Sequence, residues 1–153
     1  MVMMSHKKLI RSIDRETIRK AIQKAEHRTS GEIRVSVAPF FWGNVHKAAE
    51  KAFDRLGMTR TKDRNGILFF VVPGRRKFVV LGDRGIHERV GQQFWHRIVD
   101  IVTERFRTGD FTGGLIRGIE EVGEQLALHF PFNAATDVDE LPDDVDFGEK
   151  SEG

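Results

Sequence analysis

The sequence predicts an α/β fold, a three-layer α/β/α sandwich in which a mixed sheet with a central β-hairpin carries helices on both faces. Two observations lead to this prediction. Seven segments show a helical or a strand-like pattern of apolar residues, and along the chain they follow the order α-β-α-β-β-α-α. The chain has 153 residues, 39% hydrophobic and 31% charged, as expected for one globular domain with its own core.

The first half of the chain predicts a helix, a strand and a second helix. "ETIRKAIQKAE" places apolar residues at helical spacing, and Ser12 or Asp14 can cap this helix. "GEIRVSV" alternates apolar and polar residues, which predicts a strand that Pro39 ends. Asn44 precedes a helical stripe that stops at Gly57, so it predicts a capped second helix.

The second half predicts a hairpin and two further helices. "MTRTKDRN" (58–65) predicts a polar loop. "GILFFVV" is apolar on both faces, as in a central strand, and "KFVVLG" is its antiparallel partner after the turn "PGRR". Apolar stripes over 95–106 and 111–126 predict two helices, and Pro131 ends the second. The glycines of the last helix predict close packing against a neighbour rather than a phosphate site.

The predicted organisation has three parts: an N-terminal extension (1–12), a domain (13–130) and an acidic C-terminal tail (131–153). The tail has eight acidic residues against one lysine, a net charge of −7, and since the whole chain carries +2, the rest carries +9. The tail is therefore expected to shield a basic face of the domain, an attraction that salt screens over about 8–10 Å. It is predicted to be extended and anchored by Leu141, Val145 and Phe147.

Several classes of protein are not predicted. The chain has no cysteine, which excludes disulfides, thiolate zinc sites and a cysteine nucleophile. No segment resembles a signal peptide or reaches the roughly 18–20 apolar residues of a membrane span, so we expect a cytoplasmic protein. The glycine spacing fits no nucleotide-binding loop, so no nucleotide or organic cofactor is predicted. Arginines are scattered among acids, so no nucleic-acid binding is predicted.

The stretch "LGDRGIHERVG" (81–91) is the strongest candidate for chemistry, because it lies where a predicted strand leads into a helix. Ligand sites in layered α/β folds often lie at such strand ends. We expect this stretch to be a loop that forms the rim of a binding cleft. The predicted cleft residues are Gly82, Asp83, Arg84, Gly85, His87 and Glu88, together with Asn65.

Three carboxylates are predicted to converge at this rim as metal ligands. Asp83 and Glu88 belong to the stretch itself, and the hairpin brings Asp63 towards the same edge. Carboxylate oxygens are hard ligands that suit calcium or magnesium. Converging carboxylates repel one another, so either a divalent ion or the arginines Arg84 and Arg89 must compensate them. The sequence leaves these two alternatives open.

The segment "SGEIR" receives a purely structural interpretation. Ser30 and Gly31 predict a turn from helix to strand. Glu32 and Arg34 predict a cross-strand charge pair. Neither feature predicts chemistry.

Three segments carry a resemblance to a known family: "AEHRTSGEIRVSV", "RNGILFFVVPGRRKFVVLGDRGIHERVG" followed by "FW", and "FRTGDFTGGLIRGIEEVGEQLALHFP". In order and spacing they resemble the TPM domain family, from Ile13 to Phe147. The segment "ELPD" (140–143) is similar to the end of a bacterial branch of that family. The family's small α/β/α sandwich agrees with the predicted order of elements.

The resemblance implies a limited set of functions. Plant members of the family are reported as acid phosphatases with bound calcium, and other members act as accessory or assembly proteins. The family's acidic, glycine-bearing loop corresponds here to Gly82–Glu88 and the preceding segment to Asp63–Gly66, where Arg64 departs from the family pattern.

The expected function is therefore an accessory module that binds a divalent cation (calcium or magnesium) or a partner. The partner would be an unknown protein or a small ligand, and a membrane-associated partner stays open. The chain has no Asp-x-Asp motif and no histidine or cysteine phosphatase signature. The alternative is a weak, metal-dependent phosphomonoesterase of the acid-phosphatase type, with Arg84 on the phosphate.

Overall fold

The computed structural model describes residues 13–39, 41–133 and 144–148. Their helices and strands are α2 (Arg15–Glu26), β1 (Glu32–Val37), α3 (Val45–Arg55), β2 (Gly66–Val72), β3 (Lys77–Gly82), α4 (Arg84–Phe106) and α5 (Phe111–His129). Two 3₁₀ turns, η1 (Met58–Arg60) and η2 (Pro73–Arg75), lie on either side of β2. The predicted α/β class and order of elements are confirmed. The predicted extension at 1–12 and the predicted anchor Leu141 lie outside the described residues, and the domain boundaries stay predictions.

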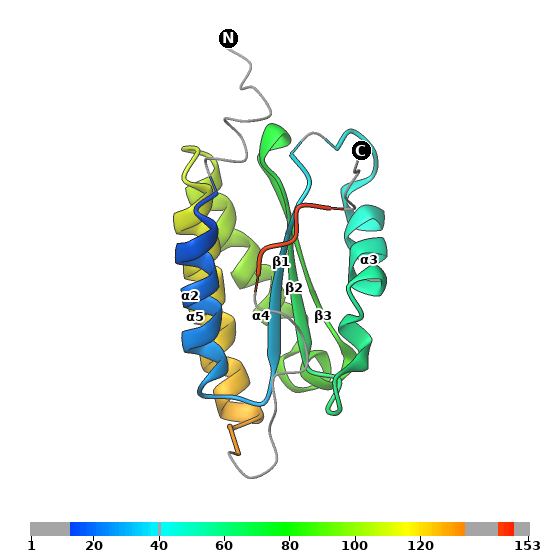
Figure 1. The fold of residues 1–153 in the computed structure, drawn as a ribbon, viewed down its shortest axis with the longest axis vertical. Coiled ribbons are helices and arrows are strands. Elements are labelled where there is room, and N and C mark those ends of the chain that lie inside the picture. The colour runs from blue at the N-terminus through cyan, green and yellow to red at the C-terminus, as the bar shows by residue number, and fades with distance from the viewer. Residues whose placement is uncertain (1–12, 40, 134–143, 149–153) are drawn as a thin grey trace.

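The three strands form one mixed sheet in the order β1-β2-β3. β1 and β2 run parallel, whereas β2 and β3 form an antiparallel hairpin that pairs Ile67 with Gly82 and Val72 with Lys77. The predicted hairpin is confirmed. In Figure 1 the sheet lies between α3 on one side and α2 with α5 on the other.

Alternate residues of β2 supply two hydrophobic clusters, one on each face of the sheet. Ile67, Phe69 and Val71 pack against the side chains of α2, α4 and α5. Leu68, Phe70 and Val72 pack against α3 and Met58. Each fully buried side chain of this size contributes about 1.5–3 kcal/mol relative to an exposed one. Helices therefore cover both faces of the sheet, as predicted.

Short polar side chains begin the first two helices. Asp14 caps α2, where its carboxylate accepts the backbone N–H of Thr17, and Asn44 caps α3 in the same way. Gly57 follows α3 with a φ of 68°, a left-handed conformation that favours glycine. Such caps contribute about 1 kcal/mol each. These predicted boundaries are confirmed because each depends on a contact within a few residues.

Two predicted loops are wrong. Residues 58–65 are not a plain polar loop, because η1 places Met58 in the core and Asn65 is also buried. Residues 84–91 are not a loop but the first part of α4, which Asp83 caps. Gly91, with a φ of 77° and a ψ of 171°, interrupts this helix before its longer second part. The glycines of this stretch made the helix hard to predict from the sequence. Its first turn contacts the segment before β2, where the Gly85 N–H donates to the Arg64 carbonyl.

The glycines of α5 lie where the helix approaches its neighbours closely, as predicted. A Cβ on Gly118 would lie 2.8 Å from a methyl of Val102 and 2.9 Å from the ring of Phe69. A Cβ on Gly123 would lie 3.0 Å from the Cβ of Ala25 on α2. These positions allow α5 to pack tightly against α2, α4 and the sheet.

The described part of the acidic tail, residues 144–148, runs beside β1 as a short parallel partner (Figure 1). The backbone N–H of Val37 donates to the carbonyl of Asp146 at 2.7 Å, and the N–H of Asp146 donates to the carbonyl of Val35 at 2.9 Å. Val145 is buried in the main core, and Phe147 packs against it from a partly buried position. The expected anchoring by Val145 and Phe147 is confirmed.

Ion pairs also hold this segment. Asp146 accepts two hydrogen bonds from the guanidinium of Arg55, at 2.8 and 3.2 Å, and one from the Ser36 hydroxyl at 2.8 Å. Asp144 pairs with Arg15 at 2.8 Å. At these two places an acidic side chain of the tail therefore compensates an arginine of the domain.

Lowering the pH should release this segment from β1. Burial raises the pKa of the Asp146 carboxyl, but the hydrogen bonds from Arg55 and Ser36 outweigh it, so the pKa lies below its ordinary value of 3.8. A lowered pKa stabilises the docked segment above about pH 4, and this contribution is lost as the pH falls through the lowered pKa. We expect the amide chemical shift of Val37 to report this step.

The matched control is Asp146→Asn, which cannot titrate. Its Val37 amide should show no corresponding step below about pH 4. A step of equal size in this variant would mean that another group controls the release.

Candidate functional site

The candidate site lies at the edge of the sheet where β2 begins and β3 ends. The backbone N–H of Asp83 donates to the carbonyl of Gly66 at 2.9 Å, and the N–H of Gly85 donates to the carbonyl of Arg64 at 2.8 Å. The hairpin thus brings the segment before β2 against the first turn of α4. The backbones meet so closely at Gly85 that only glycine fits there.

An ion pair between Arg64 and Asp83 joins the segment before β2 to the start of α4 at this edge. The Arg64 guanidinium donates to both carboxylate oxygens of Asp83, at 2.6 and 2.9 Å, and the Asp83 side chain is only 6% exposed. The same carboxylate accepts the backbone N–H of Arg84 and so caps α4. Arg64 itself adopts a φ of 51°, which is uncommon for a residue with a side chain.

This contact favours the charged form of Arg64. The hydrogen bond that Arg64 donates to Asp83 raises the pKa of the guanidinium above its ordinary value. A planar guanidinium that donates two parallel hydrogen bonds recognises a carboxylate strongly and with a fixed geometry. Arg64 and Asp83 therefore act as one neutral, rigid unit at the edge.

Asn65 lies beside this pair and is 1% exposed. Its backbone N–H donates to the Thr61 hydroxyl at 3.1 Å, and its side-chain amide donates to the Ser30 hydroxyl at 3.2 Å. Within the described residues its amide oxygen is buried without a hydrogen-bond partner. A water molecule is the usual partner of such an atom.

His87 and Trp95 form a second contact on α4. The indole N–H of Trp95 donates to Nδ1 of His87 at 2.9 Å, so this nitrogen accepts and carries no proton in the contact. The Trp95 ring covers Gly82, where a Cβ would come within 2.4 Å of it. His87 is thereby held at the surface, one helical turn after Asp83.

The predicted metal ligands do not form a group. Among the residues described by the structure, no three histidine, aspartate or glutamate side chains lie close enough together to hold a metal ion. Asp63 and Glu88 are exposed, whereas the buried oxygens of Asp83 already accept N–H groups from Arg64 and Arg84. The residues as arranged do not fit calcium or magnesium.

The cation that compensates Asp83 is therefore Arg64, and not Arg84 or Arg89 as the sequence suggested. Arg84 is exposed, and its contribution to Asp83 is its backbone N–H. Arg89 lies over the ring of Phe130, 5.5 Å from its centroid. Sequence reasoning missed Arg64 because it precedes β2 by two positions and reaches Asp83 only through the hairpin.

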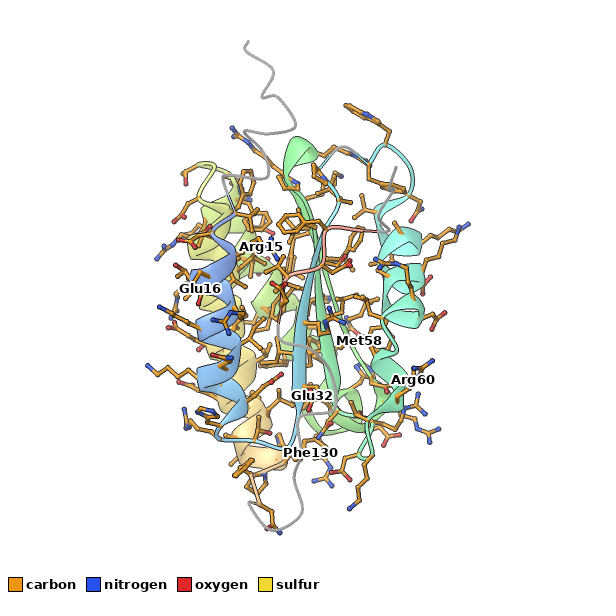
Figure 2. All side chains as sticks on the ribbon, viewed as in Figure 1. Arg15, Glu16, Glu32, Met58, Arg60 and Phe130 are labelled. Atoms are coloured by element: carbon orange, nitrogen blue, oxygen red, sulfur yellow. The ribbon has the colours of Figure 1, made fainter. Side chains whose placement is uncertain are left out.

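A buried polar face on β1 was also missed. Glu32, Arg34 and Ser36 all lie on the face that carries Leu68 and Phe70, and all three are buried. Figure 2 shows Glu32 on β1. In this view α2, which carries Arg15 and Glu16, lies on one side of it, and the segment that carries Met58 and Arg60 lies on the other.

The predicted charge pair of Glu32 and Arg34 is not a cross-strand pair. These residues lie on one strand, where Glu32 is paired with Gly66 and Arg34 with Leu68. The alternation of "EIRVSV" correctly gives the two faces of β1. It does not show that the polar face is covered.

The fold and the site together define a small α/β domain with an internal ion pair, Arg64–Asp83, at the edge of the sheet where the candidate site lies. No helix among the described residues is long and apolar enough to span a bilayer. The TPM domain matches residues 3–125, and the chain belongs to the TPM domain family.

Solved structures agree with this assignment. The chain is similar to the BA42 protein of the psychrophilic bacterium Bizionia argentinensis, determined by NMR, with a TM-score of 0.81 and 38% identity over 88% of this chain and 92% of that one. No curated protein matches it.

Two more distant structures share the fold alone. The N-terminal domain of the cg2496 protein of Corynebacterium glutamicum has a TM-score of 0.58 and 16% identity, over 72% of this chain and 70% of that one. The N-terminal domain of a P. gingivalis protein has a TM-score of 0.62 and 19% identity, over 77% and 78%.

Proposed function

We propose that this chain is an accessory module that binds a partner, rather than a metal-dependent phosphomonoesterase. One observation carries the proposal: both oxygens of the Asp83 carboxylate are engaged by the Arg64 guanidinium. A metal-assisted hydrolase needs carboxylates that face a metal ion or the reacting water. Asp83 instead serves as a helix cap and an ion-pair partner, so its chemistry is structural.

The surface around the closed pair supports recognition. Lys62, Asp63, Arg84, His87 and Glu88 are exposed around it and come from two segments that are hydrogen-bonded to each other. No bound ion is needed to hold these side chains in their relative positions, because the Arg64–Asp83 pair joins the two segments. A fixed surface of mixed charge suits selective contact with a protein partner, where complementary charges supply specificity more than affinity.

The proposal predicts that the protein will not hydrolyse aryl phosphates efficiently. We expect the full chain to show the same background rate without metal, with magnesium and with calcium. Asp83→Asn and the exposed control Glu88→Gln should not change this rate, which is measured as release of the phenolate product. Rapid metal-dependent turnover that Asp83→Asn abolishes and Glu88→Gln retains would overturn the proposal in favour of the phosphatase.

A calcium or magnesium titration tests the cation-binding alternative. Because Arg64 already compensates Asp83, we expect millimolar-range ion to leave the amide resonances of residues 82–88 unmoved, as appropriate for at most a weak site. The second sample is the variant Arg64→Asn. Asparagine tolerates the left-handed backbone at this position but lacks the guanidinium. Saturable shifts at these residues in the unmodified protein would show that the ion displaces Arg64, and the cation-binding alternative would then replace partner binding.

A further inference from the structure

The opposite end of the sheet carries a different feature, an exposed tryptophan whose two neighbours in the chain are hydrogen-bonded to Arg75. Trp42 lies between β1 and α3, and its side chain is 72% exposed. Only Leu128 is comparably exposed among the large apolar side chains of the described residues. Single exposed apolar side chains are common on protein surfaces, but an exposed indole offers a partner both an apolar ring and a polar N–H.

Arg75 fixes the backbone on both sides of Trp42. Its guanidinium nitrogen Nη1 donates to the carbonyl of Phe41 at 3.2 Å and to the carbonyl of Gly43 at 2.8 Å. The Phe41 ring lies over Gly43, where a Cβ would come within 2.8 Å of it. Arg75 therefore holds the backbone on either side of Trp42, and the Trp42 side chain is left exposed.

The β2–β3 turn forms the support for this loop. The backbone N–H of Gly74 donates to the carbonyl of Pro39 at 3.1 Å, in addition to the two bonds from Arg75. In Figure 1 the loop after β1 and the turn between β2 and β3 lie at the same end of the molecule. The described residues of the candidate site, before β2 and after β3, lie at the other end.

Positive charge gathers around this support. Arg75, Arg76 and Lys77 follow one another through the turn, and Arg76 donates to the backbone carbonyl of Arg107 at 2.8 Å, which joins the end of α4 to the group. Within the described part of the chain, no ion pair joins any of these four side chains to a carboxylate. Asp110, the nearest acid along the chain after Arg107, pairs with Arg105.

We propose that this end of the molecule docks on an anionic membrane surface, with the Trp42 indole at the level of the lipid headgroups. Tryptophan prefers this level because its ring is apolar and its N–H is polar. Basic residues next to it are attracted by anionic lipids. The ring projects from the end of the molecule, and a lipid surface accepts a projecting ring without having a matching pocket, whereas a protein partner would have to supply one.

Binding to vesicles tests the proposal with the full chain. We expect it to bind vesicles of phosphatidylcholine with phosphatidylserine but not vesicles of phosphatidylcholine alone, and the binding should weaken with salt. Trp42 emission should shift to the blue on binding, while the buried Trp95 contributes a constant background. Trp42→Ala should abolish the shift and reduce vesicle binding, whereas Leu128→Ala, which removes an exposed apolar side chain elsewhere, should leave both unchanged.

Charge reversal separates local from global electrostatics. Each basic residue near an anionic surface strengthens binding about fivefold, so Lys77→Glu, a change of two charges, should weaken it roughly 25-fold. Lys20→Glu on α2 makes the same change in net charge away from this end and should have a much smaller effect. Equal effects of these variants, or no dependence on phosphatidylserine, would overturn the proposal. Trp42-dependent binding to polyglutamate without binding to vesicles would overturn it as well, in favour of an acidic protein segment.

Discussion

Gly85→Ala should destabilise the protein by about 3 kcal/mol, because no side chain can move to accommodate the added methyl group. A Cβ at this position would lie 2.2 Å from the carbonyl oxygen of Asp63 and 2.6 Å from that of Arg64. Both atoms belong to the backbone, so the methyl group must push the segment before β2 away from α4. The hydrogen bond from the Gly85 N–H to the Arg64 carbonyl and the Arg64–Asp83 pair would both be strained.

Thermal unfolding measures the effect. For a chain of this size a loss of about 3 kcal/mol corresponds to a fall in Tm of roughly 6–12 °C. The control is Gly57→Asn, since Asn tolerates the left-handed backbone of Gly57 and the atoms nearest to an added Cβ belong to the flexible Arg60 side chain, the first at 3.2 Å. If both variants lowered Tm equally, the close approach at Gly85 would not be the cause.

Asp83→Ala should cost about 2–3 kcal/mol, the second-largest effect that we expect. The substitution removes the cap of α4 and leaves the guanidinium of Arg64 beside a largely buried position without its carboxylate. Asp83→Asn should be milder, because an amide oxygen can still accept the Arg84 N–H although the charge is lost. Denaturant unfolding of the three proteins measures these differences.

Arg64→Gly shows whether the pair, rather than the cap alone, is responsible. Glycine relieves the left-handed backbone of Arg64, which costs a residue with a side chain of order 1 kcal/mol or more. In the Asp83→Ala background, where no carboxylate holds the guanidinium, Arg64→Gly should therefore stabilise the protein. In the unmodified protein the same substitution also breaks the Arg64–Asp83 ion pair, and this loss of stability opposes the gain from the relieved backbone. The same change in stability in both backgrounds would show that Arg64 and Asp83 are not coupled.

Local contacts made much of the fold predictable from the sequence. Asp14 and Asn44 cap their helices through N–H groups three residues away, so a short window of sequence contains all the information. The apolar run of β2 predicts burial on both faces because each face must meet a helix layer. The hairpin likewise depends on a turn whose residues are adjacent in the chain.

The place of the candidate site stays a prediction, and its contacts were not evident from the sequence. The sequence treated residues 84–91 as a loop and did not pair Asp83 with Arg64. The contacts that decide both matters come from the segment before β2, including a guanidinium 19 residues away from Asp83. Whether a carboxylate faces a metal ion or an arginine depends on side-chain directions that a spacing pattern does not contain.

The burial of β1 could not be predicted for a related reason. Its polar residues Arg34 and Ser36 suggest a face in water, but Ser36 bonds to a residue 110 positions later in the chain. The interpretation of the tail as an anchored segment was correct about Val145. It gave no indication of which strand the tail would join.

The docking of the tail on β1 also sets an order of events when the protein is made. β1 is an edge strand until Asp146 pairs with it, and an unpaired edge can join another chain. Ribosomes add about 5–20 residues per second, so several seconds separate the synthesis of Ser36 from that of Asp146. During this interval the nascent chain can complete its hairpin while the edge of β1 stays open. The short acidic segment therefore covers the β1 edge at Ser36 once it has been made, and chains cut before residue 144 should aggregate more readily during synthesis through this edge.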